Sequence, residues 1–492
     1  MRRLLLLLLC LAFVVPVHAH VGSKDIFEQV QAGPYKLYVT VRPPDVIPGV
    51  AVVEVRVSGD AVPDTLRITP VPMVGEASKH PPTPDTLRVS AQDAKFFTGS
   101  VWLMSSGSWK VSVLADGPAG SGTGSVPVPA VAVKMLRMSR SIAMVLGVLG
   151  LLLVVGIAAI VAAAARESRL TPGTKPSAFN NRRAWIAGGV TLALVLTAVW
   201  LGGKWWDVEA ADYGEGVYRP LSLTPTLKNG TLDLVVGKDA DSSYWQRKNT
   251  DLLPDHGHLM HLYAIREPGM DAVFHLHPTL AGPGDLKMAL PAMPAGHYRL
   301  FADIVHKSGL PETLTAKLDV PQDFHGGALA AEDAAASPTP ITANELGAQF
   351  HLPDGYTMTW DKPESLKADE ASLFRFQLLD ASGKPAHDVV PYLGMSGHAA
   401  FVRDDFSTFA HTHPEGSAPM QSMEVANGES SDMAAPPMDS MATMHGMTMP
   451  EQHLPPTVEF PYGFPKSGRY RIFVQMKHGN TVETGVFDAD VQ

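Results

Sequence analysis

The chain has 492 residues, enough for about three domains. Its 39 Lys and Arg residues against 49 Asp and Glu residues give a net charge of −10, and no basic run is long enough to follow a phosphate backbone, which excludes nucleic acid as a partner. The 43 glycines and 41 prolines favour many short strands and turns over long helices.

Residues 1–19, MRRLLLLLLCLAFVVPVHA, have the three parts of a secretory signal peptide: a basic start, an apolar stretch and a small-residue ending. We expect cleavage after Ala19. Cys10 is the only cysteine, so its removal would leave no thiol. Disulfides, cysteine-based zinc sites and cysteine nucleophiles are therefore excluded for the mature protein.

Residues 20–134 alternate short β-rich runs with turn clusters, as in YKLYVTVRPP, VAVVEVRVSG and GSWKVSVLADG. This spacing predicts an extracytoplasmic antiparallel β-sandwich. The segment resembles the YtkA-like and FixH-like group of secreted immunoglobulin-like domains. The resemblance implies an immunoglobulin-like fold, and some members of the group are associated with copper handling or oxidase maturation.

Two apolar runs, 141–165 and 184–203, are each long enough to span a bilayer and are predicted transmembrane helices. The loop between them, 166–183, carries five Lys and Arg residues, which predicts a cytoplasmic position. Three basic residues before the first run dilute that signal, but the signal peptide also sends residues 20–134 outward. We expect a bacterial inner-membrane protein whose soluble domains face the periplasm. The alternative is a pair of buried core helices.

An internal repeat follows the second apolar run. The segment 260–278 matches 397–414, and 294–313 matches 466–484. The match predicts two homologous β-domains, 207–325 and 343–492, joined by a flexible Ala- and Pro-rich linker at 326–342. The fold class expected is therefore mainly β: three immunoglobulin-like antiparallel β-sandwiches plus two transmembrane helices.

The repeat duplicates a set of histidines around a predicted hairpin. A turn at Pro268 and Gly269 would place His261 opposite His275, with the same pairing for the second copy, so three imidazoles share one face in each copy. Imidazole suits copper and zinc. The candidate ligands, each copy's later-strand histidine included as a fourth, are His261, His275, His277, His306, His398, His411, His413 and His478. His256 and His258 are expected to be loop residues near the first copy only. Alternatively, all these histidines are structural hydrogen-bonding groups.

The second copy contains an insertion, 415–456, in which eight methionines fall between Met420 and Met449 without apolar periodicity. We expect a disordered loop. Thioethers select Cu(I), and the MHGMTM run resembles the Met/His-rich segments of bacterial periplasmic copper-resistance proteins. The candidate copper ligands here are Met441, Met444, His445, Met447 and Met449. A functionless insertion and an oxidation-scavenging tract are the alternatives.

Motifs for c-type haem attachment, nucleotide binding and serine hydrolysis are absent from the sequence. We therefore expect a membrane-anchored, non-enzymatic metal-binding protein for copper tolerance, storage or delivery, with zinc as the other candidate ion and a cuproenzyme or metal-efflux protein as partner. The second copy leads directly into the methionines and is the better candidate for copper. The alternative is an immunoglobulin-like scaffold or assembly subunit of a membrane complex with structural histidines, and a metalloenzyme is a third possibility.

Overall fold

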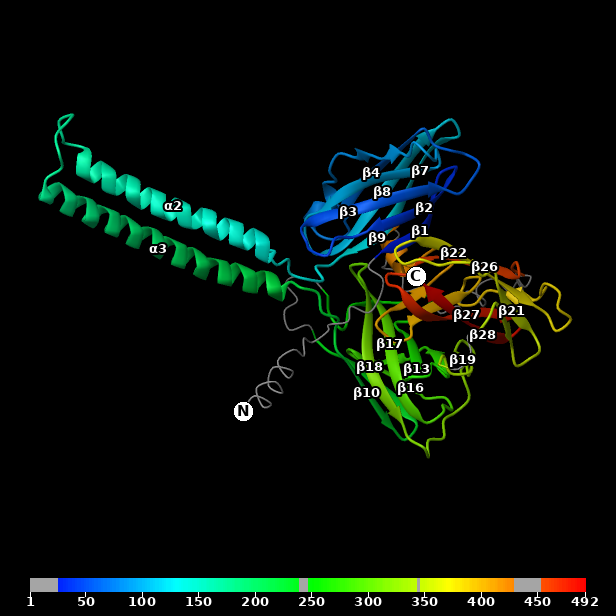
Figure 1. Cartoon of the computed structure of the whole chain (residues 1–492). Helices are drawn as coiled ribbons and strands as arrows, with labels where there is room; N and C mark the ends of the chain where they lie inside the picture. Colours follow the sequence, from blue (N-terminus) through cyan, green and yellow to red (C-terminus); the bar gives the residue numbers. More distant parts are fainter. Residues whose placement is uncertain (1–24, 239–246, 343–345, 429–452) are drawn as a thin grey trace. The chain divides into compact units, whose positions relative to one another are not determined.

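The computed structural model describes residues 25–238, 247–342, 346–428 and 453–492. The predicted signal peptide with Cys10 and six of the eight methionines of the insertion lie outside the described residues. The chain divides into two compact units, one formed by Ala132–Tyr218 and the other by the rest of the chain. The second unit contains six antiparallel sheets, and the first contains two long apolar helices (Figure 1). The predicted fold class is confirmed.

The N-terminal sandwich alternates buried and exposed side chains along its strands, as a sheet with one face against a core requires. Its first sheet has the strand order β1 (Ile26–Ala32), β2 (Tyr35–Arg42), β3 (Gly49–Val57), β7 (Phe96–Leu103) and β6 (Arg88–Val89). Its second sheet has the order β5 (Asp85–Thr86), β4 (Thr65–Pro72), β8 (Gly107–Gly117) and β9 (Gly120–Ala130), with a 3-10 turn, η1, at Glu76–Lys79.

The first repeat is a second sandwich. Its outer sheet has the order β10 (Leu223–Lys228), β11 (Thr231–Val236), β16 (Asp285–Ala289) and β15 (Thr279–Gly282). Its inner sheet has the order β12 (Leu252–Leu253), β17 (Gly296–His306), β13 (His261–Arg266), β14 (Val273–Leu276) and β19 (Ala334–Ala336), and β18 (Pro311–Val320) also pairs with β17.

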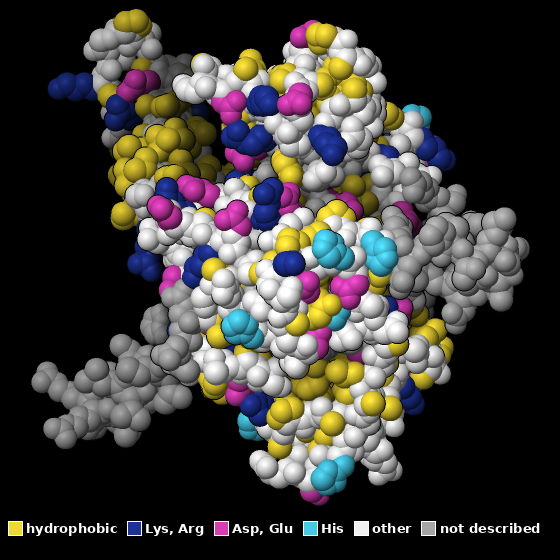
Figure 2. Space-filling model, turned by 90° about the vertical axis from the view of Figure 1, so that its right-hand side faces the viewer, with side chains coloured by type: hydrophobic (Ala, Val, Ile, Leu, Met, Phe, Trp, Pro, Cys, Tyr) yellow, Lys and Arg dark blue, Asp and Glu magenta, His cyan; other side chains and the backbone are white. Residues whose placement is uncertain are grey.

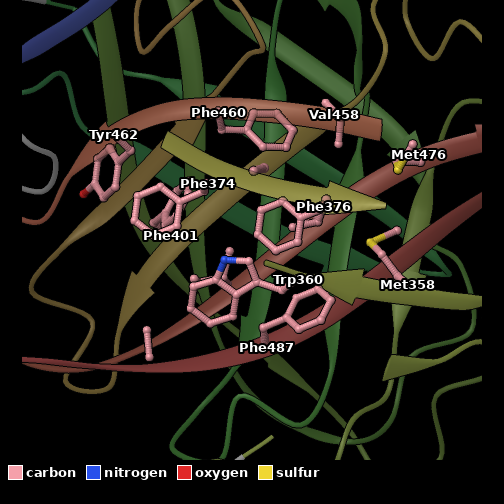
Figure 3. Close-up of a cluster of buried hydrophobic side chains, with 14 of the residues drawn as sticks. Met358, Trp360, Phe374, Phe376, Phe401, Val458, Phe460, Tyr462, Met476 and Phe487 are labelled. Atoms are coloured by element: carbon pink, nitrogen blue, oxygen red, sulfur yellow. The ribbon is translucent and has the colours of Figure 1, made fainter. Parts of the chain in front are cut away.

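The second repeat has the same plan. One sheet has the order β20 (Gln349–His351), β21 (Thr357–Trp360), β22 (Ala371–Leu379) and β26 (Thr457–Gly463). The inner sheet has the order β23 (Val389–Val390), β27 (Gly468–His478), β24 (His398–Arg403) and β25 (Phe409–Thr412), and β28 (Thr481–Val491) pairs with β27. An aromatic core that includes Trp360, Phe376 and Phe401 fills the space between these two sheets (Figure 3).

The inner sheets of the two repeats face each other, and an apolar cluster separate from the two sandwich cores lies between them. Phe301 of the first repeat stacks on Phe409 of the second, with ring centroids 4.3 Å apart, and Tyr263 meets the same ring at 5.3 Å. The histidine-bearing strands β13 and β24 both belong to these inner sheets. The strand faces that the repeat predicts to carry histidines therefore point toward the opposite repeat.

The helical unit consists of α2 (Arg140–Glu167) and α3 (Ala178–Glu215), which lie side by side (Figure 1). Ser139 and Ser177 cap their N-termini. Both helices are long and apolar enough to cross a membrane, and neither has a buried residue. Helix α3 extends well beyond the predicted span 184–203 at both ends and takes in the last residues of the loop predicted at 166–183.

Two predictions about irregular segments were wrong in part. The linker predicted at 326–342 contains β19, which pairs with β14 and so belongs to the first repeat. The insertion predicted to be disordered from residue 415 begins with a helix, α4 (Met420–Asn427), which buries Ser422 and Ala426. The helix ends at Gly428, whose left-handed backbone conformation suits glycine. Both segments are ordered by packing against distant parts of the chain, which a local sequence pattern does not reveal.

Candidate metal centre

Eight histidine side chains meet between the two inner sheets, and we refer to them as the histidine cluster. Adjacent rings have centroids between 4.2 and 6.4 Å apart. Five of the rings are buried, and on the face drawn in Figure 2 histidines appear only as separate patches. The cluster comprises His256, His258, His261, His275, His277, His398, His411 and His413.

Within the cluster, His261, His275 and His277 form the first triad. One ring nitrogen from each of them lies within 4.8 Å of the other two. Atoms that share one ion at about 2 Å per bond lie at most about 4 Å apart, so a small side-chain adjustment closes the triad around an ion. The predicted convergence of these three residues in the first repeat is therefore present.

The outer nitrogens of the first triad all face acceptor oxygens. His261 Nε2 lies 3.1 Å from the Asp255 carbonyl, His275 Nδ1 2.8 Å from Gln475 Oε1, and His277 Nδ1 3.0 Å from Asp333 Oδ1. When each neutral ring carries its hydrogen on the outer nitrogen and donates it, the inner nitrogens are left with lone pairs.

Those inner lone pairs point at one another. His261 Nδ1 and His275 Nε2 lie 3.1 Å apart, and His277 Nε2 has no hydrogen-bond partner among the described residues. Two lone pairs at hydrogen-bond distance with no hydrogen between them repel each other, and a bound cation removes that repulsion. Histidine ligands in metal sites characteristically have the opposite nitrogen held by a carboxylate or carbonyl oxygen, as here.

His256, His398 and His413 form the second triad, again with ring nitrogens within 4.8 Å of one another. His398 is fully buried, and neither of its ring nitrogens has a partner in the part of the chain that the structure describes. A buried polar atom without a partner costs about 1–3 kcal/mol, so this arrangement is unfavourable without a ligand. The second triad includes one residue, His256, from the first repeat.

The two repeats exchange contacts with one another's histidines. Asp303 lies opposite His261 on the neighbouring strand, and Gln475 lies opposite His398 in the same way. Asp303 reaches His411 of the other repeat at 3.3 Å, and Gln475 reaches His275 at 2.8 Å. Asp303 and Gln475 thus occupy equivalent positions in the two repeats and contact equivalent rings. One contact uses a carboxylate and the other an amide, so the two halves of the cluster differ chemically.

Burial keeps the five buried rings of the cluster neutral. It lowers the pKa of His261, His275 and His277 well below the usual value, and neighbouring histidines lower the pKa of each further. The same causes lower the pKa of His398 and His413. Neutral imidazole is the form that binds metal, so these rings need not lose a proton before binding at neutral pH.

The register predicted for the hairpins was wrong by two residues. His275 lies opposite Tyr263 rather than His261, and His411 lies opposite Ala400 rather than His398. Because side chains alternate between the faces of a strand, a shift of two leaves every histidine on the expected face. The convergence survives for that reason.

The expectation for the DHGHLMH segment was wrong for His256 and correct for His258. His256 lies against His398 and His413 of the second repeat, with ring centroids 5.2 and 5.1 Å away. His258 stays with the first repeat, where its ring lies 4.2 Å from that of His277 at an angle of 31° and pairs with Glu332. The proximity of these two histidines to His261 in the sequence was the only signal for their role.

The two predicted fourth ligands lie outside the cluster. His306 is fully buried between Asp251 and Glu312, 2.7 and 3.0 Å from its two ring nitrogens. His478 lies at the corresponding end of β27 beside Asp354 and Asp388. His306 and His478 each lie three residues beyond the strand partner of His261 or His398, and this odd spacing turns them to the opposite face of the inner sheet, away from the cluster.

The predicted methionine ligands Met441, Met444, Met447 and Met449, together with His445, lie outside the described residues. The described start of that segment is next to the cluster. The Gln421 amide donates to the side chain of Asp255, whose carbonyl oxygen holds His261. The chain therefore enters the methionine-rich segment from the edge of the histidine cluster.

This chain can be compared with curated proteins, solved structures and known protein families. No protein of curated function matches the sequence. Solved structures that resemble it include the chicken CNTN1 FN1–FN3 domains, with 8% identity over 95% of this chain and 99% of that chain, at a TM-score of 0.13. Another is E. coli alpha-2-macroglobulin, with 10% identity over 95% of this chain and 25% of that chain, at a TM-score of 0.15. At these TM-scores the likenesses support no functional inference.

The family match covers the two repeats and not the N-terminal sandwich, so the resemblance of residues 20–134 to YtkA-like and FixH-like domains stays a prediction. The matched segments contain all the histidines of both triads. Residues 223–322 and 350–492 match the family described as Domain of unknown function (DUF8832), and this part of the chain is a DUF8832 domain.

Proposed function

We propose that this protein is a membrane-anchored metal-binding protein that holds two copper ions in the histidine cluster between its two repeats. The observation that carries the proposal is the set of inward-facing imidazole lone pairs. In the first triad all three outer nitrogens have acceptor partners, and a cation bound between the rings would satisfy the three inner ones together. Each triad offers three ligands and leaves a fourth position free, as in many zinc and copper sites.

Copper is favoured over zinc by what surrounds the cluster. Imidazole binds both ions, and copper binds the more tightly of the two in most nitrogen sites. The methionine-rich segment that begins beside the cluster supplies thioethers, which select Cu(I). In this proposal Met441, Met444, His445, Met447 and Met449 collect Cu(I), and the triads hold it for storage or for delivery to a cuproenzyme or an efflux protein.

Burial supports binding rather than catalysis. His261, His275 and His398 are at most 2% exposed, so an ion can be enclosed there but an organic substrate has no surface to approach. The two apolar helices would anchor the chain in a bacterial inner membrane, with the β-domains on the periplasmic side.

Metal content tests this function. The full chain, purified in detergent, is equilibrated with Cu(I), Cu(II) or Zn(II), desalted and measured for bound metal. We expect about two copper ions per chain to be retained by the triads. Changing His275 to Asn and His398 to Asn together should remove both, while His297→Asn, an exposed histidine paired with Asp319, should remove none. Retention of no metal at micromolar affinity would refute the proposal and favour structural histidines.

A further inference from the structure

The duplication places a second kind of cluster on the opposite face of each inner sheet, where β17 and β27 end. In the first repeat, His306 lies opposite Leu252, and Glu312 lies opposite Ile304. In the second repeat, His478 lies opposite Val389, and Glu483 lies opposite Met476. Asp251 and Asp388 directly precede the paired strand residues. Each repeat thus brings one aspartate, one histidine and one glutamate together at equivalent positions.

The first repeat completes its cluster with an internal cation. Asp251 holds Nδ1 of His306, and Glu312 lies 3.0 Å from Nε2. The guanidinium of Arg247 then forms a buried ion pair with the other oxygen of Glu312. Both charged side chains are at most 2% exposed, so the arginine neutralises a carboxylate that has no access to water.

The second repeat has the same anionic groups and a different surrounding. Asp388 lies 3.4 Å from Nδ1 of His478 and accepts a hydrogen bond from Tyr356, whose ring stacks on the imidazole at 3.9 Å. On the Nε2 side, Asp354 lies 2.8 Å away, as Glu312 does in the first repeat at 3.0 Å. The second repeat therefore has both Glu483 and a further carboxylate, Asp354, where the first repeat pairs its glutamate with Arg247.

Because of this difference, the negative charge of Glu483 is not balanced as that of Glu312 is. Glu483 is 7% exposed, and among the described residues its carboxylate has no ion pair with a basic side chain. Its carboxylate, Asp354 and Nε2 of His478 lie within 4.8 Å of one another. Burial and the nearby Asp354 raise the pKa of Glu483 to about 7, as expected for a carboxylate without a cationic partner.

We propose that Asp354, His478 and Glu483 bind a divalent cation of the Zn²⁺ or Mn²⁺ class, which takes the place that Arg247 occupies in the first repeat. Asp388 and Tyr356 hold the ring of His478 with Nε2 turned toward the ion. One imidazole and two carboxylates suit these two ions better than Cu(I), so the site is chemically distinct from the histidine cluster.

Substitutions in the full-length protein in detergent test the site. Bound Zn²⁺ is measured after desalting, and Mn²⁺ binding is followed by loss of the free-ion signal in electron paramagnetic resonance. With copper already bound in the triads, the wild-type chain should bind one equivalent of Zn²⁺ or Mn²⁺ that Glu483→Gln and Asp354→Asn bind at least tenfold more weakly. The exposed control Glu370→Gln should bind as the wild type does. Copper retention by the histidine cluster should be the same in all four proteins.

Asp354→Arg gives a second, independent test. Its guanidinium would supply the positive charge that Arg247 supplies in the first repeat, so this variant should fold, lose the Zn²⁺ or Mn²⁺ equivalent and keep its copper. Asp354 is part-exposed, so the substitution leaves the apolar core intact. Equal Zn²⁺ and Mn²⁺ binding by wild type, Glu483→Gln and Asp354→Arg, or no binding of either ion by wild type, would overturn the proposal. Neither result would bear on copper in the triads.

Discussion

Replacing His256 by Asn removes the one ligand that the first repeat contributes to the second triad. The backbone at His256 has a positive φ of 50°, a conformation that Asn tolerates better than most residues, so the loop should keep its shape. The triad would retain only His398 and His413. We expect this variant to bind one copper ion tightly instead of two.

The expected effect can be worked out as a change in melting temperature. An ion present at one hundred times its dissociation constant adds about 2.7 kcal/mol to the stability of the protein that binds it. For roughly 270 residues of the C-terminal part, an unfolding entropy of about 2.1 cal/mol/K per residue converts this into a shift of about 5 °C per ion. Two ions should raise the wild-type melting temperature by about 10 °C, and one ion should raise that of the variant by about 5 °C.

The assay is thermal unfolding of the full chain, followed by intrinsic fluorescence with and without copper. The copper-induced shift is taken within each protein, so any change in the stability of the metal-free variant cancels. His297→Asn, in which only an exposed ring is lost, should show the wild-type shift. A full shift for His256→Asn would refute its role as a ligand and with it the link between the repeats.

Three further predictions concern stability. Arg247→Ala should lower the free energy of unfolding by about 3–5 kcal/mol in urea, because it leaves the buried Glu312 unpaired; a loss below about 1 kcal/mol would contradict this. Burial lowers the pKa of His306, but hydrogen bonds to Asp251 and Glu312 outweigh it and raise the pKa to about 8. Because this pKa is above the unfolded value, about 2 kcal/mol of stability present below pH 6.5 should be lost as the pH rises through 8; His306→Gln should flatten this dependence in urea titrations, and an unchanged slope would count against it. Phe401→Ala in the core of Figure 3 should cost about 3–5 kcal/mol, against under 1 kcal/mol for the exposed Leu373→Ala.

The repeat in the sequence predicted the histidine faces because strand periodicity tolerates an error of two in register. The turn is wider than a simple reading of Pro268 and Gly269 indicates: the Arg266 amide bonds to the Ala272 carbonyl and closes the loop around Gly269. Residues separated by an even number of positions share a face of the strand whatever the register. His261, His275 and His277 therefore still converge.

The contribution of His256 to the second triad could not be predicted from local patterns. It depends on how the two inner sheets dock, and that docking is set by apolar contacts such as Phe301 with Phe409. The partners Gln475 and Asp303 were missed for the same reason, since each lies in one repeat and contacts a histidine of the other. The copper ligands expected in the methionine-rich segment stay a prediction.

Anomalous diffraction from crystals grown with copper tests the central claim most directly. We predict two copper peaks between the inner sheets, one within about 2.0–2.1 Å of nitrogens from His261, His275 and His277, and one at the same distance from nitrogens of the second triad. Copper peaks found only outside the histidine cluster, or no copper peak at all, would contradict the account.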